Sequence, residues 1–262
     1  MHDALQNEPD ALGPFRLVRE AGRVVLGPGL SARRWIAIDD RVLSNHVVYA
    51  LDGCRGRARV RRVMAAAEAV AEQSAAHMLP IQSVTVCPRR GVCVVTAYTG
   101  HNIGLCTVGE LIAQRGAGLS VAELRRAVEH AGSALAALHQ RGLVDGALCL
   151  SRLLVDRGGR IHTELCGLWA AVVGYSCNSE TIRDDVRSLV RMTGEMIGRD
   201  DERVRAEFAR WLADGLDPLG GYPSVAAALA LLPSGHGAAS EEPRIGVIRG
   251  LLDRLRGVVA SR

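Results

Sequence analysis

Lysine is absent from this sequence of 262 residues. All 32 basic residues are therefore arginine, and against 28 acidic residues they leave a formal net charge of +4. Arginine stays protonated and offers a planar fork of N–H donors, whereas lysine offers a compact charge with a tunable pKa. The absence of lysine therefore excludes any mechanism that needs one.

Aromatic residues, long apolar runs and paired cysteines are also scarce or missing. The aromatic content of 3% leaves little for base stacking, so we expect no nucleic-acid partner. No apolar run reaches the roughly 20 residues that cross a bilayer, and the first eight residues are polar and acidic. We therefore expect a cytoplasmic protein. The seven cysteines occur singly, which predicts reduced thiols and neither a metal site nor a disulfide framework.

The character of the sequence changes along the chain. Residues 1–14 are polar with two prolines and predict a disordered lead-in. Residues 15–98 hold short β-branched and apolar runs typical of strands, interrupted by one alanine-rich helix over residues 61–76. Residues 99–232 are mainly helical; the longest helix spans residues 120–141 and begins with a capping box. This order predicts an α+β fold with a small β-rich lobe and a larger helical lobe.

The segment 142–156 carries the most informative pattern. It resembles the catalytic loop of bacterial Ser/Thr protein kinases, in which a His-Arg-Asp motif is followed by a lysine and a metal-binding asparagine. The frame is present here, but the chemical positions differ. The motif's His-Arg-Asp reads Asp145-Gly146-Ala147, Cys149 stands at the lysine and Arg152 at the asparagine. In the Asp-Phe-Gly motif that follows, Leu165 stands at the metal-binding aspartate and only Gly167 is retained.

Two segments of the small lobe complete the resemblance. Gly27 and Gly29 fall in a glycine-rich loop with Ala32 at the third glycine position, and a nucleotide would meet Ala97 and Tyr98 at the segment between the lobes. The strand that carries the phosphate-pairing lysine in kinases has Ala50 at that position, or Tyr49 if the frame slips by one residue. We interpret these residues as a vestigial nucleotide site.

The resemblance implies a kinase fold without kinase chemistry. Phosphoryl transfer depends on a positioned base, a lysine and divalent ions, and none of those groups stands at its position. We therefore expect a pseudokinase that acts as a protein-binding, scaffolding or regulatory module, with no resident cofactor, no magnesium site and no catalytic residue. The alternative is an atypical Ser/Thr kinase or a nucleotide-binding kinase-fold protein with residual ATP binding. Arg152 could neutralise phosphate without a metal, but it could not orient an in-line attack as a metal does.

The C-terminal residues 233–262 read as a linker followed by a basic amphipathic helix. Apolar residues recur on one helical face over residues 244–260, with arginines beside them. Such a helix can bind a partner protein, lie on a membrane surface or pack on the large lobe. We expect the protein partner to use this helix or the large lobe, and contact with a membrane surface is the less favoured reading.

Overall fold

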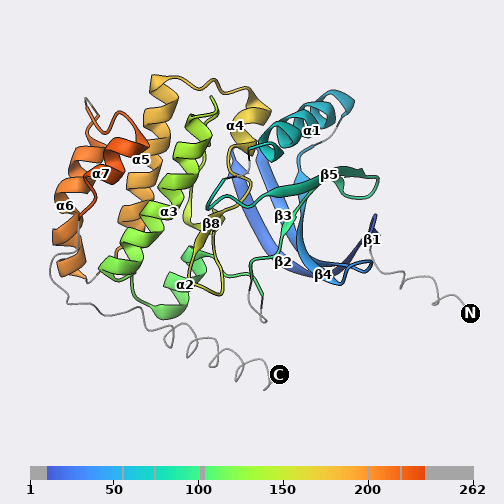
Figure 1. Ribbon diagram of the computed structural model, residues 1–262, viewed down its shortest axis with the longest axis horizontal. Helices are drawn as coiled ribbons and strands as arrows, with labels where there is room; N and C mark the ends of the chain where they lie inside the picture. Colours follow the sequence, from blue (N-terminus) through green and yellow to red (C-terminus); the bar gives the residue numbers. More distant parts are fainter. Residues whose placement is uncertain are drawn as a thin grey trace, which may run out of the picture.

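The computed structural model describes residues 11–54, 56–73, 75–100, 104–199, 201–218 and 220–233. The small lobe is a six-stranded antiparallel sheet with the order β1-β2-β3-β4-β6-β5. One helix, α1, packs on it (Figure 1). The bounds are β1 Ala11–Leu12, β2 Phe15–Gly27, β3 Leu30–Asp39, β4 Ser44–Asp52, α1 Arg57–Ala71, β5 Ile81–Cys87 and β6 Gly91–Ala97.

Side-chain alternation divides this sheet into two faces. In β4, Val47, Tyr49 and Leu51 belong to the cluster that includes the apolar side of α1, whereas Val48 and Ala50 belong to a cluster on the other face. Successive side chains of a strand point to opposite faces, so this division follows directly from the sequence. The face that packs on α1 also borders the large lobe, because Leu165 and Leu168 join its cluster.

The large lobe is helical and is built around α3. Its bounds are α2 Val108–Arg115, α3 Val121–His139, η1 Leu150–Arg152, β7 Leu153–Val155, β8 Ile161–Thr163, α4 Leu168–Val173, α5 Ser179–Met196, α6 Glu202–Leu216 and α7 Val225–Ala230. Ser120 and Glu123 form the predicted capping box at the start of α3. Apolar residues of α3 are buried against α5 and α7, which gives this lobe one continuous core.

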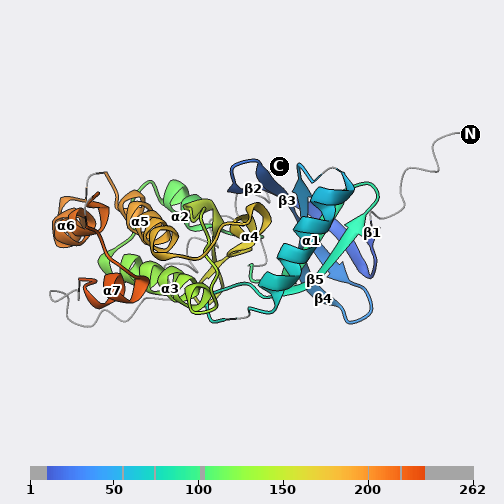
Figure 2. The ribbon, with the colours of Figure 1, turned by 90° about the horizontal axis from the view of Figure 1, so that it is seen from above.

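The two lobes lie end to end, and α4 stands between α1 and the helices of the large lobe (Figures 1 and 2). The expected α+β architecture with a small sheet lobe and a larger helical lobe is therefore confirmed. Within the described residues no helix is long and apolar enough to span a bilayer. The cytoplasmic location stays a prediction.

Two boundaries differ from the sequence prediction. The lead-in was expected to extend to residue 14, but Ala11 and Leu12 pair with Arg16 and Phe15 as strand β1, and Leu12 is buried on the sheet. The helix expected over residues 61–76 is α1, which begins four residues earlier and ends at Ala71. Residues 1–10 and the basic helix predicted over residues 244–260 lie outside the described residues.

Three histidines meet where the segment between α1 and β5 joins the large lobe. The rings of His77 and His130 stack with centroids 3.7 Å apart, and the His162 ring lies 6.1 Å from that of His77. The backbone of Ile161 bonds to both stacked rings: its carbonyl oxygen accepts from Nδ1 of His77 at 3.0 Å, and its N–H donates to Nδ1 of His130 at 3.1 Å. Nε2 of His162 bonds to Asp156 at 3.1 Å.

Protonation of His130 is unfavourable in the folded state. Burial, together with the charges of His77 and Arg126, lowers the pKa of His130 to about 4, while Glu129 opposes the shift. A histidine whose pKa is lower in the folded than in the unfolded state contributes stability that is present above about pH 6.5 and is lost as the pH falls. The junction between the lobes is therefore acid-sensitive.

We expect the melting temperature to fall when the pH is lowered from about 7 to about 5, and to fall less in His130→Asn. The amide oxygen of asparagine can take the position of Nδ1 and accept the bond from Ile161, but asparagine does not titrate. Thermal unfolding of both proteins across this pH range measures the difference. An identical pH dependence in the two proteins would contradict this assignment.

Candidate functional site

The glycine-rich turn is covered by a tryptophan from the large lobe. Trp169 lies in α4, and its indole Nε1 donates to the carbonyl oxygen of Pro28 at 3.1 Å. A Cβ atom added to Gly27 would lie 2.3–2.5 Å from the indole ring, so the ring rests directly on the backbone. The same ring touches Gly146 in the segment that resembles a catalytic loop, where an added Cβ would lie 2.7 Å away. Trp169 is thus wedged between the two lobes.

A buried polar network lies further along the same face of the sheet. Arg34 in β3 and Tyr49 in β4 are directly paired across the strands, and both reach Glu164, which follows β8 in the large lobe. Nε of Arg34 donates to Oε1 of Glu164 at 2.8 Å, and Nη2 donates to Oε2. Tyr49 donates to Oε1 at 2.6 Å, and Arg34 also donates to the carbonyl oxygen of Ser151 at 2.6 Å. Arg34 therefore connects the small lobe to two segments of the large lobe.

The charges of this network balance each other away from solvent. Glu164 and Tyr49 are fully buried, and Arg34 is 4% exposed. Burial raises the pKa of Glu164, an effect that the charge of Arg34 opposes. For Arg34, burial works to lower the pKa, but the carboxylate of Glu164 outweighs burial and the pKa is raised. Since Glu164 only accepts from these partners, we assign it as the carboxylate.

Tyr49, and not Ala50, lies on the inner face of the sheet. Ala50 was the first choice for the position of the phosphate-pairing lysine, with Tyr49 as the choice after a shift of one residue. The structure places Ala50 in the cluster on the opposite face of the sheet and Tyr49 on the face toward α1 and Glu164. A frame shifted by one residue also fits the sequence. The Val-Ala-Ile-Lys pattern can be aligned with His46-Val47-Val48-Tyr49, and this frame agrees with the alternation of the strand.

A second buried ion pair closes the segment that resembles the catalytic loop. The guanidinium of Arg152 donates to both carboxylate oxygens of Asp145, at 2.7 and 2.9 Å, and both side chains are fully buried. It also donates to the carbonyl oxygens of Ala147, Glu164 and Leu165, at 2.9, 2.9 and 3.1 Å. Burial works to raise the pKa of Asp145, but the charge of Arg152 and several hydrogen bonds lower it overall.

Asp145 and Arg152 thus bind the segments on either side of them. The N–H groups of Gly167 and Ala147 donate to Asp145 at 2.8 and 3.3 Å. Arg152, predicted as a charge at the metal position, is committed to Asp145 and to three carbonyl oxygens. Its side chain is 0% exposed, so the guanidinium lies out of solvent among these acceptors. Its suggested role in neutralising a phosphate stays a hypothesis.

Asp185 in α5 binds the backbone of the segment that resembles the catalytic loop. It accepts from the backbone N–H groups of Asp145 and Gly146 at 2.8 and 2.7 Å, and its Oδ2 lies 2.8 Å from Nε2 of His139. Asp185 is fully buried, so these bonds are shielded from water. These bonds join α5 to the end of α3 and to the segment that resembles the catalytic loop.

The remaining predicted positions offer little chemistry. The side chain of Leu165 packs into the small-lobe cluster, and its backbone has a positive φ of 45°. Cys149 is partly exposed, with its sulfur 3.3 Å from the hydroxyl of Ser151. Ala147 has only a methyl group. The positions that bind metal in kinases therefore hold a buried guanidinium and an isobutyl group, which offer no oxygen ligand and do not fit a divalent ion.

The four residues of the vestigial nucleotide site lie at the two ends of the sheet's inner face. Gly27 and Gly29 form the β2–β3 turn, with Gly29 at φ 72°, and Ala97 ends β6 beside His46 of β4. Tyr98 follows in the segment between the lobes. Arg34 and Tyr49 lie between these ends, on the pair of strands that connects them. The buried side chains of Arg34 and Tyr49 therefore lie between the two pairs of predicted residues.

Sequence reasoning did not identify Trp169, Arg34 or Glu164. A signal for Arg34 was available, because it alternates in β3 with Ala32 and Ile36, which are buried. A charged residue at an inward position of a strand calls for a buried partner of opposite charge. No comparable signal identifies Trp169, since its position depends on how the chain folds after Gly167.

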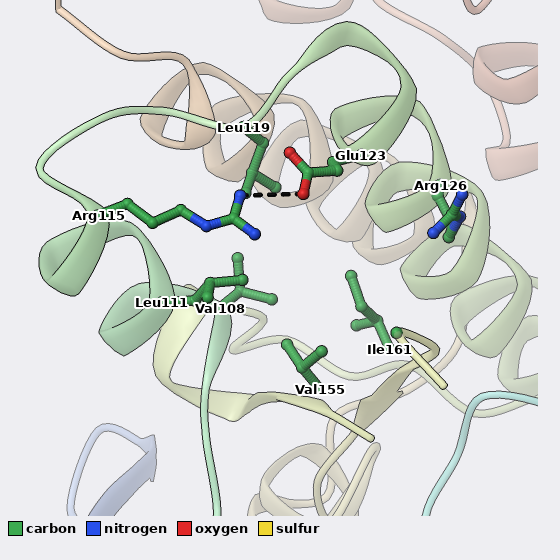
Figure 3. Close-up of a pocket in the computed structure, with 9 residues that line it drawn as sticks. Val108, Leu111, Arg115, Leu119, Glu123, Arg126, Val155 and Ile161 are labelled. Atoms are coloured by element: carbon green, nitrogen blue, oxygen red, sulfur yellow. Dashed lines mark hydrogen bonds and ion pairs between the residues drawn. The ribbon is translucent and has the colours of Figure 1, made fainter. Parts of the chain in front are cut away.

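A small cavity lies elsewhere in the large lobe, between α2, the start of α3 and the β7–β8 hairpin (Figure 3). It has a volume of about 40 Å³, and the ion pair between Arg115 and Glu123 (2.9 Å) borders it. Val108, Leu111, Val155 and Ile161 give it an apolar floor. It is separate from the site between the lobes.

We expect Gly27→Ala to destabilise the protein by about 1–3 kcal/mol, because the new methyl group would overlap the indole of Trp169. In a Trp169→Ala background the same change is expected to cost less, so the two effects will not add. Gly29→Ala is the matched control, because no atom lies within 4 Å of its added Cβ. Urea denaturation of the four proteins and the control pair measures the coupling; equal coupling for Gly27 and Gly29 would refute the wedge.

We expect Arg152→Ala to cost about 3–5 kcal/mol, because it leaves the Asp145 carboxylate buried without a counter-charge. The double variant with Asp145→Ala should cost less than the sum of the two single variants. The exposed pair Arg16–Asp40 provides the control, and its loss should have a much smaller effect, because solvent screens the two charges. Strict additivity at Asp145 and Arg152 would contradict a functioning ion pair.

Comparison with known proteins identifies the fold. No protein-family model and no curated protein matches the sequence. The kinase domain of PknI from Mycobacterium tuberculosis matches with a TM-score of 0.64 over 86% of this chain and 97% of that domain, at 15% identity. A double-mutant form of that domain has a TM-score of 0.67 with the same coverage and identity. The PAN3 pseudokinase of Drosophila melanogaster matches with a TM-score of 0.58 over 96% of this chain and 69% of that chain, also at 15% identity. The chain therefore has the protein-kinase fold.

Proposed function

We propose that this chain is a catalytically inactive protein-kinase-like domain that acts by binding other proteins, as a scaffolding or regulatory module. The observation that carries the proposal is the filled site between the lobes. Trp169 occupies the space under the glycine-rich turn, and the Arg34–Glu164–Tyr49 network occupies the middle of the sheet's inner face. Because its own side chains fill this site, we propose that the domain functions through its outer surface, by binding other proteins.

The residues around the site support the loss of phosphoryl transfer. Transfer requires a carboxylate base near the attacking hydroxyl and positive charge on the phosphates, arranged around divalent ions. Here Ala147 stands at the base and Tyr49 at the lysine. The guanidinium of Arg152, at the position of the metal-binding asparagine, is engaged by Asp145. Each replacement alone would lower the rate severely, and nothing in the described site supplies the missing groups.

The same geometry argues against nucleotide binding. Access for a nucleotide would require moving the Trp169 ring off Gly27 and breaking a buried ion pair between Arg34 and Glu164. Breaking a buried ion pair is unfavourable by several kcal/mol, because both charges lose their partner. One observation favours nucleotide binding: the glycine-rich turn retains two glycines of the kinase motif, Gly27 and Gly29. That turn sustains the alternative of an ATP-binding kinase-fold protein.

We expect ATP to leave the melting temperature unchanged, with or without Mg²⁺ or Mn²⁺. A ligand present at a hundredfold its dissociation constant would stabilise the protein by about 2.7 kcal/mol, which corresponds to a rise of about 5–10 °C for a domain of this size. A thermal-shift titration measures this, with an active protein kinase in the same plate as the control.

Radiolabelled ATP provides the second readout. No label is expected on the protein itself or on a generic substrate such as myelin basic protein. A metal-dependent thermal shift accompanied by label transfer would overturn the proposal in favour of an atypical kinase. A shift without transfer would retain the loss of catalysis but would contradict the filled site.

A further inference from the structure

The charges of helix α1 run against its dipole. A helix carries partial positive charge at its N-terminus, where acidic side chains are favourable and basic ones are not. Helices α2, α3, α5 and α6 follow this rule with a glutamate in the first turn. Helix α1 has no acidic residue in its first turn and no basic residue in its last. Its arginines at positions 57, 59, 61 and 62 all lie in the first half, and Glu68 lies near the end. Arg59 donates to the carbonyl oxygen of Gly29 at 3.0 Å, which leaves Arg57, Arg61 and Arg62.

This arrangement is unfavourable for the isolated protein. The three arginines are exposed, and none of them has an acidic partner among the described residues. The N-cap residue is Gly56, which has no side chain to accept from the free N–H groups of the first turn. Charge repulsion and the dipole thus both act against α1, and burial of its apolar side must compensate for them.

Further arginines gather at the same end of the small lobe. The β2–β3 turn, the end of β4 and the β5–β6 turn lie together because Ser31 pairs with Asp52, Ala50 with Cys93 and Cys87 with Gly91. Arg89 in the β5–β6 turn is exposed, and both views place this turn on the same side of the lobe as the start of α1 (Figures 1 and 2). Asp52 is the nearby acid, and Arg23 and Arg33 already pair with it, at 2.7 and 3.8 Å.

The two lobes differ in charge as a result. Residues 15–98 contain 13 arginines and 6 acidic residues, a net charge of +7. Residues 99–232 contain 14 arginines and 16 acidic residues, a net charge of −2. The modest overall charge of +4 therefore conceals a strongly basic small lobe.

We propose that Arg57, Arg61, Arg62 and Arg89, here called the arginine patch, form a docking surface for an acidic segment of a partner protein. This rests on the proposed function, because it names a surface through which the inactive domain binds. Guanidinium groups match carboxylates in geometry and form paired hydrogen bonds with them. A partner rich in Asp and Glu would relieve the repulsion within the patch and favour the first turn of α1.

Other polyanions fit the surface less well. Nucleic-acid binding by a basic surface usually adds exposed aromatic rings for stacking, whereas the nearby Trp35 ring is covered by the guanidinium of Arg90 at 4.3 Å. A helix that binds membranes buries an apolar face among the lipids. The apolar face of α1, with Val63, Ala67 and Val70, is already buried against the sheet.

A binding titration tests the docking surface. The probe is a fluorescein-labelled peptide of repeating Asp-Glu-Glu-Leu, followed by fluorescence anisotropy at low ionic strength. We expect the patch variant R57Q/R61Q/R62Q/R89Q to bind at least about tenfold more weakly than the natural protein. The matched control is R183Q/R191Q/R199Q/R203Q, which removes the same charge from exposed arginines of the large lobe and should change the affinity by less than about twofold.

Several results would overturn the proposal. An equal loss in both variants would mean that net charge alone attracts the peptide, and no binding by the natural protein would remove the surface altogether. Tighter binding of a mixed-sequence DNA duplex or of phosphatidylserine vesicles than of the peptide would contradict the partner class. These readouts are independent of ATP, so they separate failure of the docking surface from failure of the inactive-domain proposal.

The stability of the patch variant gives a second test. Because the arginines oppose the α1 dipole and repel one another, their removal is expected to raise the melting temperature by about 1–4 °C. The control variant should leave it nearly unchanged. A lower melting temperature for the patch variant would show that these arginines stabilise the free protein and would contradict their assignment to a partner.

Discussion

The hydrogen bonds of Arg152 determine how the centre of the molecule is arranged. Its guanidinium lies out of solvent and donates to the carboxylate of Asp145 and to three backbone carbonyl oxygens, which come from two separate segments. Such a concentration of buried acceptors is stable only around a cation. In protein kinases bound metal ions supply positive charge near these positions. Here the charge is covalently part of the chain and cannot dissociate, so the two segments stay joined without any ligand.

Arg34 and Trp169 also join separate segments by contacts within the protein, and their contacts connect the two lobes. Arg34 joins β3 to Glu164 and to the backbone of Ser151, and Trp169 packs on Gly27 in one lobe and on Gly146 in the other. An active kinase binds its nucleotide between these parts. In this chain contacts within the protein lie between the same parts, and the proposed loss of nucleotide binding rests on them. The lobes are therefore held together by interactions that persist in the absence of any bound molecule.

Much of the fold could be predicted from the sequence, because it depends on local patterns. The alternation in β3 and β4, the Ser120–Glu123 capping box and the β7–β8 hairpin each follow from neighbouring residues, and all appear in the structure. The candidate site depends on contacts between distant residues, and here prediction was weaker. The absence of kinase groups was visible at Ala147 and Leu165, but the partner of Arg152 was missed, although Asp145 is only seven residues away. A one-residue shift in β4 also reversed the faces of Tyr49 and Ala50, since strand side chains alternate.

All basic residues of this chain are arginine, and the chemistry of arginine matters both in the buried site and on the surface. A buried lysine shifts its pKa readily and tends to lose its charge, whereas a guanidinium keeps its charge and distributes it over five N–H donors. That property lets Arg34 and Arg152 replace ligands inside the protein, where each satisfies several acceptors. On α1 the same side chain has the opposite consequence: Arg57 and Arg61 have no acceptor among the described residues, and the helix dipole opposes them. The guanidinium groups of Arg34 and Arg152 thus have acidic partners inside the protein, whereas Arg57 and Arg61 have none among the described residues. The electrostatic argument for a binding partner therefore concerns the outer surface of the small lobe, away from the site between the lobes.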